Sequence, residues 1–128
     1  MRLLIVIFTL LLSGCMSAPT KQQTDSANYG PVPNNHETTI KNSLQYILKD
    51  PSSAVVQRIT KPRKEWFLNP ENLNTKFDYA WLSCALINAK NSFGGFTGAK
   101  QYVFFIKNNK VIYYQADQLN SGRIVKCA

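Results

Sequence analysis

Hydrophobic residues follow three patterns along the chain. Residues 3–12 form an apolar run, residues 16–35 contain few large apolar side chains, and the pattern becomes periodic from residue 36 onward. The apolar run is too short to span a bilayer, which takes about 20 residues in a helix. The polar stretch cannot bury enough surface to fold, so residues 15–35 are predicted to be a flexible tether. The periodic part predicts one domain over residues 36–128.

The first periodic segment predicts a helix over residues 36–49. Asn34 or Asn35 can cap its start. Pro51 ends it, because the residue before a proline disfavours the helical region. The apolar residues of this segment recur at helical intervals and share one face, and they are Ile40, Leu44, Ile47 and Leu48.

The rest of the domain has the pattern of strands. Residues 77–88 are mostly apolar on both faces, which predicts a long central strand covered by the helix on one side. Asn108 and Asn109 tolerate positive φ and predict a tight hairpin between strands 102–107 and 111–115. Shorter strands are expected at 54–59 and 123–127, with loops at 60–64 and 69–74. The expected fold is α+β, with one N-terminal helix packed on an antiparallel sheet of four or five strands.

Residues 1–14 have the features of a signal peptide. Arg2 precedes the apolar run, and small residues follow it directly before Cys15. The segment Leu-Ser-Gly-Cys at 12–15 resembles the lipobox of bacterial lipoproteins. That resemblance implies cleavage before Cys15, a diacylglycerol thioether on its thiol and an acylated amino group. Two or three acyl chains such as palmitate hold a protein stably on a membrane.

The residues after Cys15 indicate to which membrane a lipoprotein of this kind would be sorted. In lipoproteins of Gram-negative bacteria, an Asp directly after the lipidated cysteine favours the inner membrane, whereas Met16 and Ser17 stand here. The resemblance therefore implies the outer membrane, facing the periplasm, while the inner membrane and the cell surface stay open. The alternative is an ordinary secretory signal that has a cysteine near its cleavage site.

Composition narrows the classes of function. The chain has 15 Lys and Arg against 7 Asp and Glu, with a single histidine, His36, at the start of the predicted helix. No Ser-His-Asp, HExxH or CxxC arrangement is present. We therefore expect no enzyme, no metal and no cofactor.

The densest basic patch lies next to Trp66 and Phe67. Basic residues beside aromatic residues can bind nucleic acid, but an exported, anchored domain rarely meets it. An anionic glycan or lipid is the more fitting ligand, and a solvated basic face is the alternative. The patch consists of Arg58, Lys61, Arg63 and Lys64.

Two cysteines, Cys84 and Cys127, remain once Cys15 is lipidated. Both lie on predicted strands, and an exported location is oxidising. A disulfide between them is the favoured prediction, and it would stabilise the fold by about 4 kcal/mol in the chain-entropy model. The alternative is a pair of independent buried thiols.

Residues 88–98 form the most distinctive segment, with three glycines among five residues. One interpretation is a ligand loop in which backbone N–H groups and Lys90 hold an anion or a sugar. The other is a hairpin loop whose phenylalanines plug the end of the sheet. The candidate ligand residues are Asn88, Lys90, Asn91, Ser92, Gly94, Gly95, Thr97 and Gly98.

Two elements resemble a family of small bacterial and phage-associated proteins. Residues 50–54, Asp-Pro-Ser-Ser-Ala, match its DPxSA element. Cys84 together with residues 88–98 matches its element C-x-x-x-NAKNS-[FY]-GG-[FY]-TG. The resemblance covers residues 36–113 and implies a compact α+β domain with no catalytic role. The one recurrent cysteine of the family corresponds to Cys84, so Cys127 would be an addition in this chain.

These observations favour a non-enzymatic binding or accessory module of the cell envelope that engages another envelope protein. Trp66 and either Tyr113 or Tyr114 are the candidate anchor residues, because aromatic side chains often dominate interface energies. The alternative is a module that binds an anionic glycan or lipid through a basic surface and the glycine-rich loop. The basic residues of that alternative are Arg63, Lys64 and Lys90. An enzyme is the third interpretation.

Overall fold

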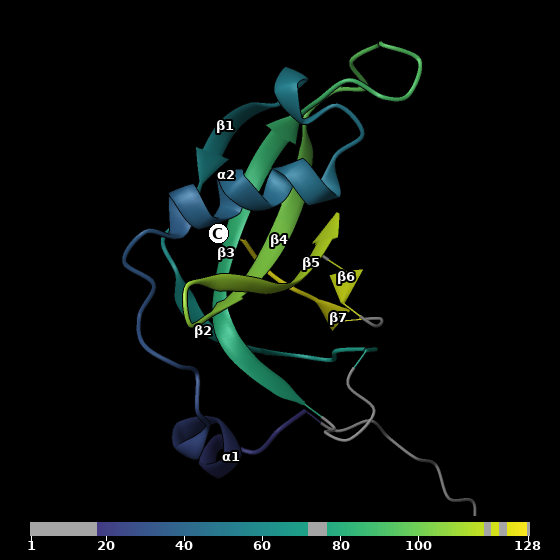
Figure 1. The fold of residues 1–128 in the computed structure, drawn as a ribbon. Helices are drawn as coiled ribbons and strands as arrows, with labels where there is room; N and C mark the ends of the chain where they lie inside the picture. The colour runs from purple at the N-terminus through teal and green to yellow at the C-terminus, as the bar shows by residue number, and fades with distance from the viewer. Residues whose placement is uncertain (1–17, 72–76, 117–118, 121–122, 128) are drawn as a thin grey trace, which may run out of the picture.

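The structure, a computed structural model, describes residues 18–71, 77–116, 119–120 and 123–127. These residues form a mixed α+β fold built on a five-stranded antiparallel sheet, as predicted, with two α-helices where one was expected (Figure 1). The helices are α1 (Lys21–Ser26), α2 (His36–Ile47) and the 3-10 turn η1 (Pro51–Ser53). The strands are β1 (Val55–Ile59), β2 (Arg63–Phe67), β3 (Asp78–Asn88), β4 (Lys100–Lys107), β5 (Lys110–Ala116), β6 (Leu119–Asn120) and β7 (Arg123–Ile124).

The central strand is β3, which confirms the prediction for residues 77–88. One edge of β3 pairs with β2 along its first half and with β1 along its second half, and the other edge pairs with β4. Strand β5 continues the sheet beyond β4, and β6 and β7 form a separate two-stranded ribbon. The loop predicted at 60–64 is wrong at its end, because β2 begins at Arg63, opposite Leu82. Pro62 lies outside the ladder, where its missing N–H costs nothing.

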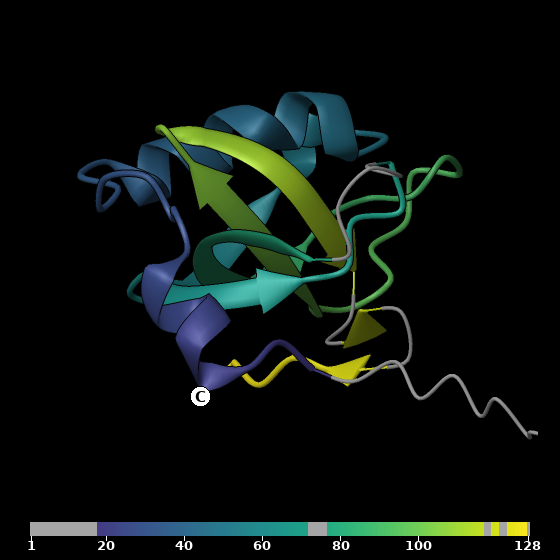
Figure 2. The ribbon, with the colours of Figure 1, turned by 90° about the horizontal axis from the view of Figure 1, so that it is seen from below.

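Helix α2 covers one face of the sheet (Figures 1 and 2). Its start agrees with the prediction, although Asn35 at the N-cap makes no side-chain hydrogen bond. The helix ends two residues before the predicted end, and Leu48 is already extended. Pro51 opens η1 instead of directly ending the helix. The buried residues of this face come from α2, β3 and β4, and they are Ile40, Leu44, Ala85, Ile87, Phe104 and Ile106.

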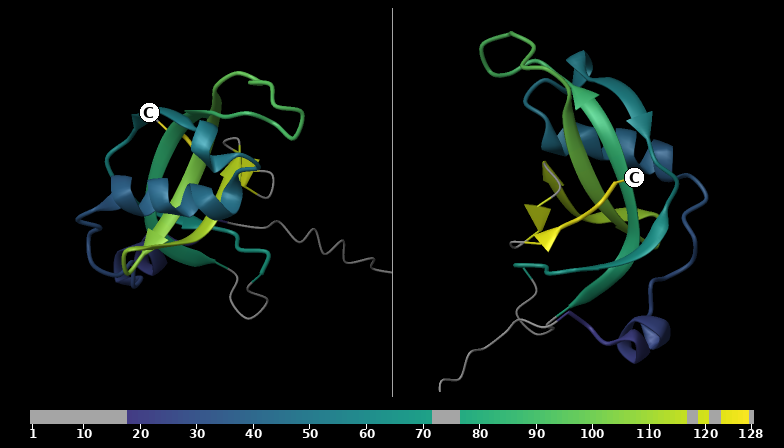
Figure 3. Two further views of the ribbon diagram at one scale, coloured as in Figure 1. Left: turned by 45° about the horizontal axis from the view of Figure 1, so that its top comes forward. Right: turned by 180° about the vertical axis from the view of Figure 1, so that it is seen from behind.

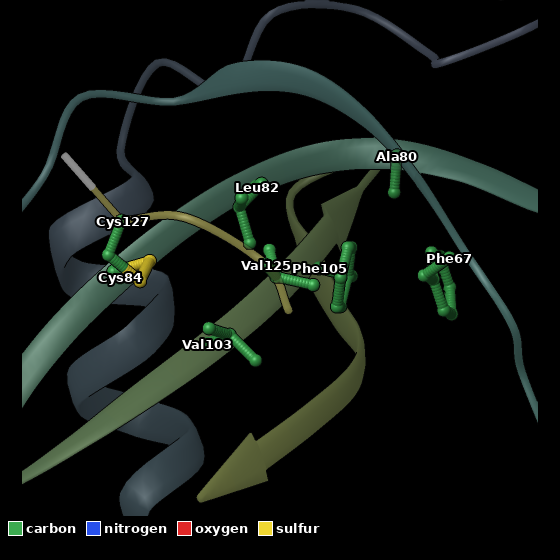
Figure 4. Packing of buried hydrophobic residues seen from close by; sticks show 8 residues of the cluster. All are labelled: Phe67, Ala80, Leu82, Cys84, Val103, Phe105, Val125 and Cys127. Carbon is green, nitrogen blue, oxygen red and sulfur yellow. A yellow bond between two sulfur atoms is a disulfide. The ribbon is translucent and has the colours of Figure 1, made fainter. Parts of the chain in front are cut away.

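The opposite face is covered by the chain end, which a disulfide holds in place. Cys84 on β3 and Cys127 are bonded, with an S–S distance of 2.01 Å, so the disulfide prediction is confirmed over two separate thiols. The strand predicted at 123–127 is present only at Arg123–Ile124, and residues 125–127 continue without strand pairing. The cluster on this face is Phe67, Ala80, Leu82, Cys84, Val103, Phe105, Val125 and Cys127 (Figure 4).

The hairpin between β4 and β5 is also as predicted. Asn108 and Asn109 have φ values of 52° and 58°, the left-handed conformation that a two-residue turn of this kind requires. The strands on either side pair from Lys107 and Lys110 outward.

The N-terminal segment differs from the flexible tether predicted for residues 15–35. Residues Lys21–Ser26 form α1, and the Tyr29 side chain is only 7% exposed, with its ring 5.6 Å from that of Tyr79. The indole N–H of Trp81 donates a hydrogen bond to the carbonyl of Gly30 at 3.1 Å. The Tyr29 ring, the buried Pro33 and the hydrogen bond from Trp81 therefore help to hold a mostly polar segment on the fold, which composition alone did not indicate.

Gly30 allows the N-terminal segment to approach the β4–β5 turn closely, which a residue with a side chain would not. Its φ is +74°, and a Cβ at this position would lie 2.9 Å from Oδ1 of Asn108 in the β4–β5 turn. A side chain would therefore be strained and would push the segment away from the turn. Gly30 therefore lets the N-terminal segment pack closely against the β4–β5 turn.

Candidate functional site

The candidate site is the connection between β3 and β4, which we call the glycine hairpin (residues 89–99). It extends beyond the sheet at the end of the molecule opposite α1 (Figures 1 and 3). Lys90 and Phe96 form an isolated antiparallel bridge, and every residue from 91 to 99 is exposed. The structure therefore places seven of the eight candidate ligand residues in one projecting loop, with Asn88 as the last residue of β3.

Asn91 holds the backbone of the glycine hairpin together. Its side-chain oxygen accepts hydrogen bonds from the N–H groups of Phe93 at 2.9 Å and Gly95 at 3.2 Å. Its own N–H donates to the carbonyl of Gly95, and its carbonyl accepts from Gly94, whose φ of +80° suits a glycine. The N–H groups of residues 91, 93, 94 and 95 are thus bound within the loop. The hypothesis that they hold an anion is wrong for these four groups.

The two phenylalanines of the loop face solvent. Phe93 is 96% exposed and Phe96 is 52% exposed, so the interpretation in which they plug the end of the sheet is also wrong. The ammonium of Lys90 lies 5.6 Å from the centre of the Phe96 ring, within the range of a cation–π contact. The loop therefore presents an apolar tip beside a positive charge.

The base of the glycine hairpin is bonded to the turn that follows α2. The N–H of Lys90 donates to the Ser53 hydroxyl at 2.9 Å, and that hydroxyl donates to the carbonyl of Asp50 at 2.7 Å. The Ser52 hydroxyl donates to the Asp50 carboxylate at 2.6 Å and lowers the pKa of that carboxyl, with Lys90 acting in the same direction. The two sequence elements at 50–54 and 88–98 are therefore one structural unit, which their separation along the chain did not indicate.

A crevice of about 200 Å³ lies between the end of α2 and this base, and we call it the lysine crevice. Three cationic residues from three segments line it, namely Lys49, Lys90 and Lys100. Its lining includes no carboxylate among the described residues. Its apolar and aromatic lining residues are Ile47, Leu48, Ile87, Ala89 and Tyr102.

The predicted basic patch is not a single surface. Arg63 lies opposite Leu82, on the disulfide face, and the next residue of β2, Lys64, is on the other face. Arg58 pairs with Leu86 on β3, and side-chain alternation places it on the disulfide face as well. Lys61 is exposed between β1 and β2. Strand geometry thus separates Lys64 from Arg58 and Arg63, which share the disulfide face.

Arg63 and Lys64 also lie far from the glycine hairpin. Their partners Leu82 and Trp81 precede Lys90 by eight or nine residues along β3, about 26 Å or more at the usual rise of a strand. The guanidinium of Arg63 donates to the carbonyl of Lys126, and the Lys64 ammonium lies 5.2 Å from the Tyr29 ring centre. A ligand surface that joins Arg63, Lys64 and Lys90 is therefore contradicted.

Two of the three aromatic anchors proposed from the sequence are packed into the fold. Trp66 meets Phe77 edge to face at 5.2 Å, and Tyr113 stacks on Phe67 at 5.4 Å. Tyr114 is 42% exposed. Among the described residues, the two most exposed aromatic side chains are Phe93 in the glycine hairpin and Tyr46 on α2, which is 90% exposed. The sequence did not indicate either of them as an anchor.

Two other kinds of feature are absent from the described residues. Within them, no group of three or more His, Cys, Asp and Glu side chains is placed to hold a metal ion. No helix in the same residues has the length and apolar character needed to cross a membrane. Cys15 and the rest of the lipobox lie outside the described part of the chain.

Comparisons with protein-family models, with curated proteins and with solved structures find no match to this chain. The resemblance to bacterial lipoproteins at residues 12–15 and the resemblance at 50–54 and 88–98 both stay predictions. The geometry of the glycine hairpin and the lysine crevice is therefore the basis on which a function is argued.

Proposed function

We propose that this chain is a membrane-anchored bacterial lipoprotein whose domain binds another protein of the cell envelope and has no enzymatic activity. The glycine hairpin is the contact element. The observation that carries the proposal is the 96% exposure of Phe93 on a loop whose backbone is fixed by Asn91. A fixed loop loses little conformational freedom on binding, and exposed aromatic rings are frequent anchors of interfaces.

The position of the glycine hairpin supports a protein partner. The anchor we propose, Cys15, precedes α1, and the glycine hairpin lies at the opposite end of the molecule (Figures 1 and 3). A domain held at its α1 end presents this loop away from the membrane that holds it. We propose that the acyl chains insert into the outer membrane from its periplasmic side, because Met16 and Ser17, and no Asp, follow Cys15.

The test uses the full-length, acylated chain in intact envelopes, with a photo-crosslinking residue in place of Phe93. Tyr46 is the matched control position, because it is an aromatic residue of similar exposure on α2. We expect one envelope protein to be crosslinked from position 93 and not from position 46. Equal crosslinking from both positions, or none from either, would contradict the proposal.

The anchor is tested separately. Cells that express the chain are fed labelled palmitate, and we expect label in the unaltered chain and none in Cys15→Ser. The same variant should lose the crosslink, because a chain that is neither cleaved nor lipidated at residue 15 no longer reaches a partner in the outer membrane. Labelling of Cys15→Ser would contradict lipidation at this position.

Binding of an anionic glycan or lipid is the second candidate, and the three lysines of the lysine crevice favour it. Such binding weakens steeply between low and physiological ionic strength. We expect it to be lost in Lys49→Glu and retained in Phe93→Ala, the reverse order of a protein interface centred on the phenylalanine. Retention on an anionic polysaccharide column at graded salt measures it.

A further inference from the structure

The lysine crevice bears on what kind of protein the glycine hairpin binds. Lys49 follows α2, Lys90 lies in the first arm of the hairpin and Lys100 begins β4, so the fold brings together three cations that are distant in sequence. Asp50 is the neighbouring acid, and its carboxylate already accepts the Ser52 hydroxyl at 2.6 Å. One such carboxylate beside three ammonium groups leaves an excess of positive charge behind the loop tip.

The rest of the lining is apolar. Ile47, Leu48 and Ile87 contribute aliphatic surface, and Tyr102 contributes an aromatic side chain. A volume of about 200 Å³ admits one or two side chains and excludes a folded element. A fitting ligand has an acidic group and a short apolar portion in the same few residues.

Lys90 connects the crevice to the exposed tip. It lines the crevice, and its ammonium lies 5.6 Å from the centre of the Phe96 ring. Its backbone N–H donates to the Ser53 hydroxyl, so the point at which the Lys90 side chain leaves the backbone is fixed. A ligand that covers Phe96 therefore also reaches Lys90, which lines the lysine crevice.

We propose, resting on the proposed function, that the partner binds through an acidic segment. An apolar residue of that segment covers Phe93 and Phe96, and one or two carboxylates enter the lysine crevice. Opposite charges on the two surfaces accelerate association and select the partner. A protein segment fits better than a lipid headgroup, because the glycine hairpin lies at the end of the fold opposite α1, the first element that follows the proposed anchor in the sequence (Figure 3).

The experiment combines crosslinking with charge reversal in the full-length, acylated chain. With the crosslinker at position 93, Lys49→Glu/Lys100→Glu is compared with Lys41→Glu/Lys110→Glu, which alters the net charge equally. All four lysines are exposed, and the control pair lies outside the lining of the crevice. We expect about a tenfold lower crosslinking yield in the first variant, little change in the second, and an acidic sequence at the crosslinked site of the partner.

Several outcomes would overturn the inference, and they are distinguishable from failure of the proposed function. Unchanged crosslinking in Lys49→Glu/Lys100→Glu refutes the acidic segment while the contact through Phe93 stands. Equal loss in both double variants refutes it as well, because it assigns the effect to net charge alone. Crosslinking to phospholipid, together with binding of the purified chain to phosphatidylglycerol vesicles that Lys49→Glu/Lys100→Glu abolishes, refutes both and identifies a lipid ligand. Absence of any crosslink from position 93 refutes the proposed function itself.

Discussion

The two ends of the molecule each place a lysine beside aromatic rings, with opposite results. At the α1 end, the Lys64 ammonium lies 5.2 Å from the ring centre of Tyr29 and 5.9 Å from that of Trp81, and Tyr29 is 7% exposed. At the hairpin end, Lys90 lies 5.6 Å from the ring centre of Phe96, and the neighbouring Phe93 is 96% exposed. The aromatic ring beside the lysine is buried at the α1 end, whereas the aromatic side chains at the hairpin end are exposed to solvent. Substitutions should therefore change stability at the first end and binding at the second.

The disulfide lies between the two ends, with Cys84 inside β3, and its loss has the largest expected effect. Cys84 and Cys127 are 43 residues apart, so reduction should lower the free energy of unfolding by about 4 kcal/mol. Urea unfolding of the chain without residues 1–15, with and without reductant, measures this. A decrease below about 1 kcal/mol would show that packing of Val125 and Cys127 suffices without the bond.

Trp81→Ala should have the next largest effect and act on the α1 end. It removes the hydrogen bond to Gly30 and the ring beside Lys64, and we expect a loss of about 3 kcal/mol. Limited proteolysis should then cleave the segment around Gly30 sooner. Phe93→Ala is the control, with an expected change within about 0.5 kcal/mol, because an exposed side chain contributes little to folding. A similar loss in both variants would contradict the contrast between the ends.

Tyr29 should make the stability of the α1 end depend on alkaline pH. Burial raises the pKa of the Tyr29 phenol above 10.0, and the charges of Tyr79, Glu65 and Asp25 add to this. The fold favours the neutral phenol, so its contribution is complete below pH 10 and is lost as pH rises further. Tyr29→Phe, which also lacks the hydrogen bond to Thr24, should lose about 1 kcal/mol at pH 7 and show a weaker decline above pH 10. Parallel pH curves for the two chains would refute this.

Asn91→Ala should have the smallest effect on stability and a large one on the glycine hairpin. The substitution frees the N–H groups of Phe93 and Gly95, so their amide hydrogens should exchange faster while the free energy of unfolding changes by less than about 0.5 kcal/mol. Crosslinking from the loop should fall, because its bound conformation is no longer preformed. Ser92→Ala serves as control within the same exposed loop. Unaltered exchange in Asn91→Ala would show that Asn91 does not hold the loop.

Local pattern was enough to predict the regular elements. The apolar stripe containing Ile40 and Leu44 faces the sheet, and the turn at Asn108 and Asn109 connects β4 to β5. These features depend on residues that are close in sequence, where helical or strand periodicity determines which side chains share a face. Predicting the disulfide between Cys84 and Cys127 required one further premise, namely that the protein is exported to an oxidising compartment.

Which residues make up the candidate site depends on the register of the strands, and the sequence does not specify that register. Arg63 and Lys64 are adjacent in the chain but lie on opposite faces of β2, so the predicted patch separates. Lys49 and Lys100 are remote in the chain but line one crevice. The burial of Tyr29 could not be predicted from local composition, because its neighbours in the sequence are polar.

The docking of Tyr29 on the sheet sets how far the domain can range from its proposed anchor. From Cys15 to the start of α1 at Lys21 there are six residues, against the twenty of a tether that runs to residue 35. A random coil of six residues has a root-mean-square length of about 14 Å and one of twenty residues about 25 Å, which corresponds to a roughly sixfold difference in accessible volume. The effective concentration of the domain toward a partner fixed in the same membrane rises by a similar factor. A partner that stands close to the membrane gains from the short tether, and one that floats free in the periplasm does not.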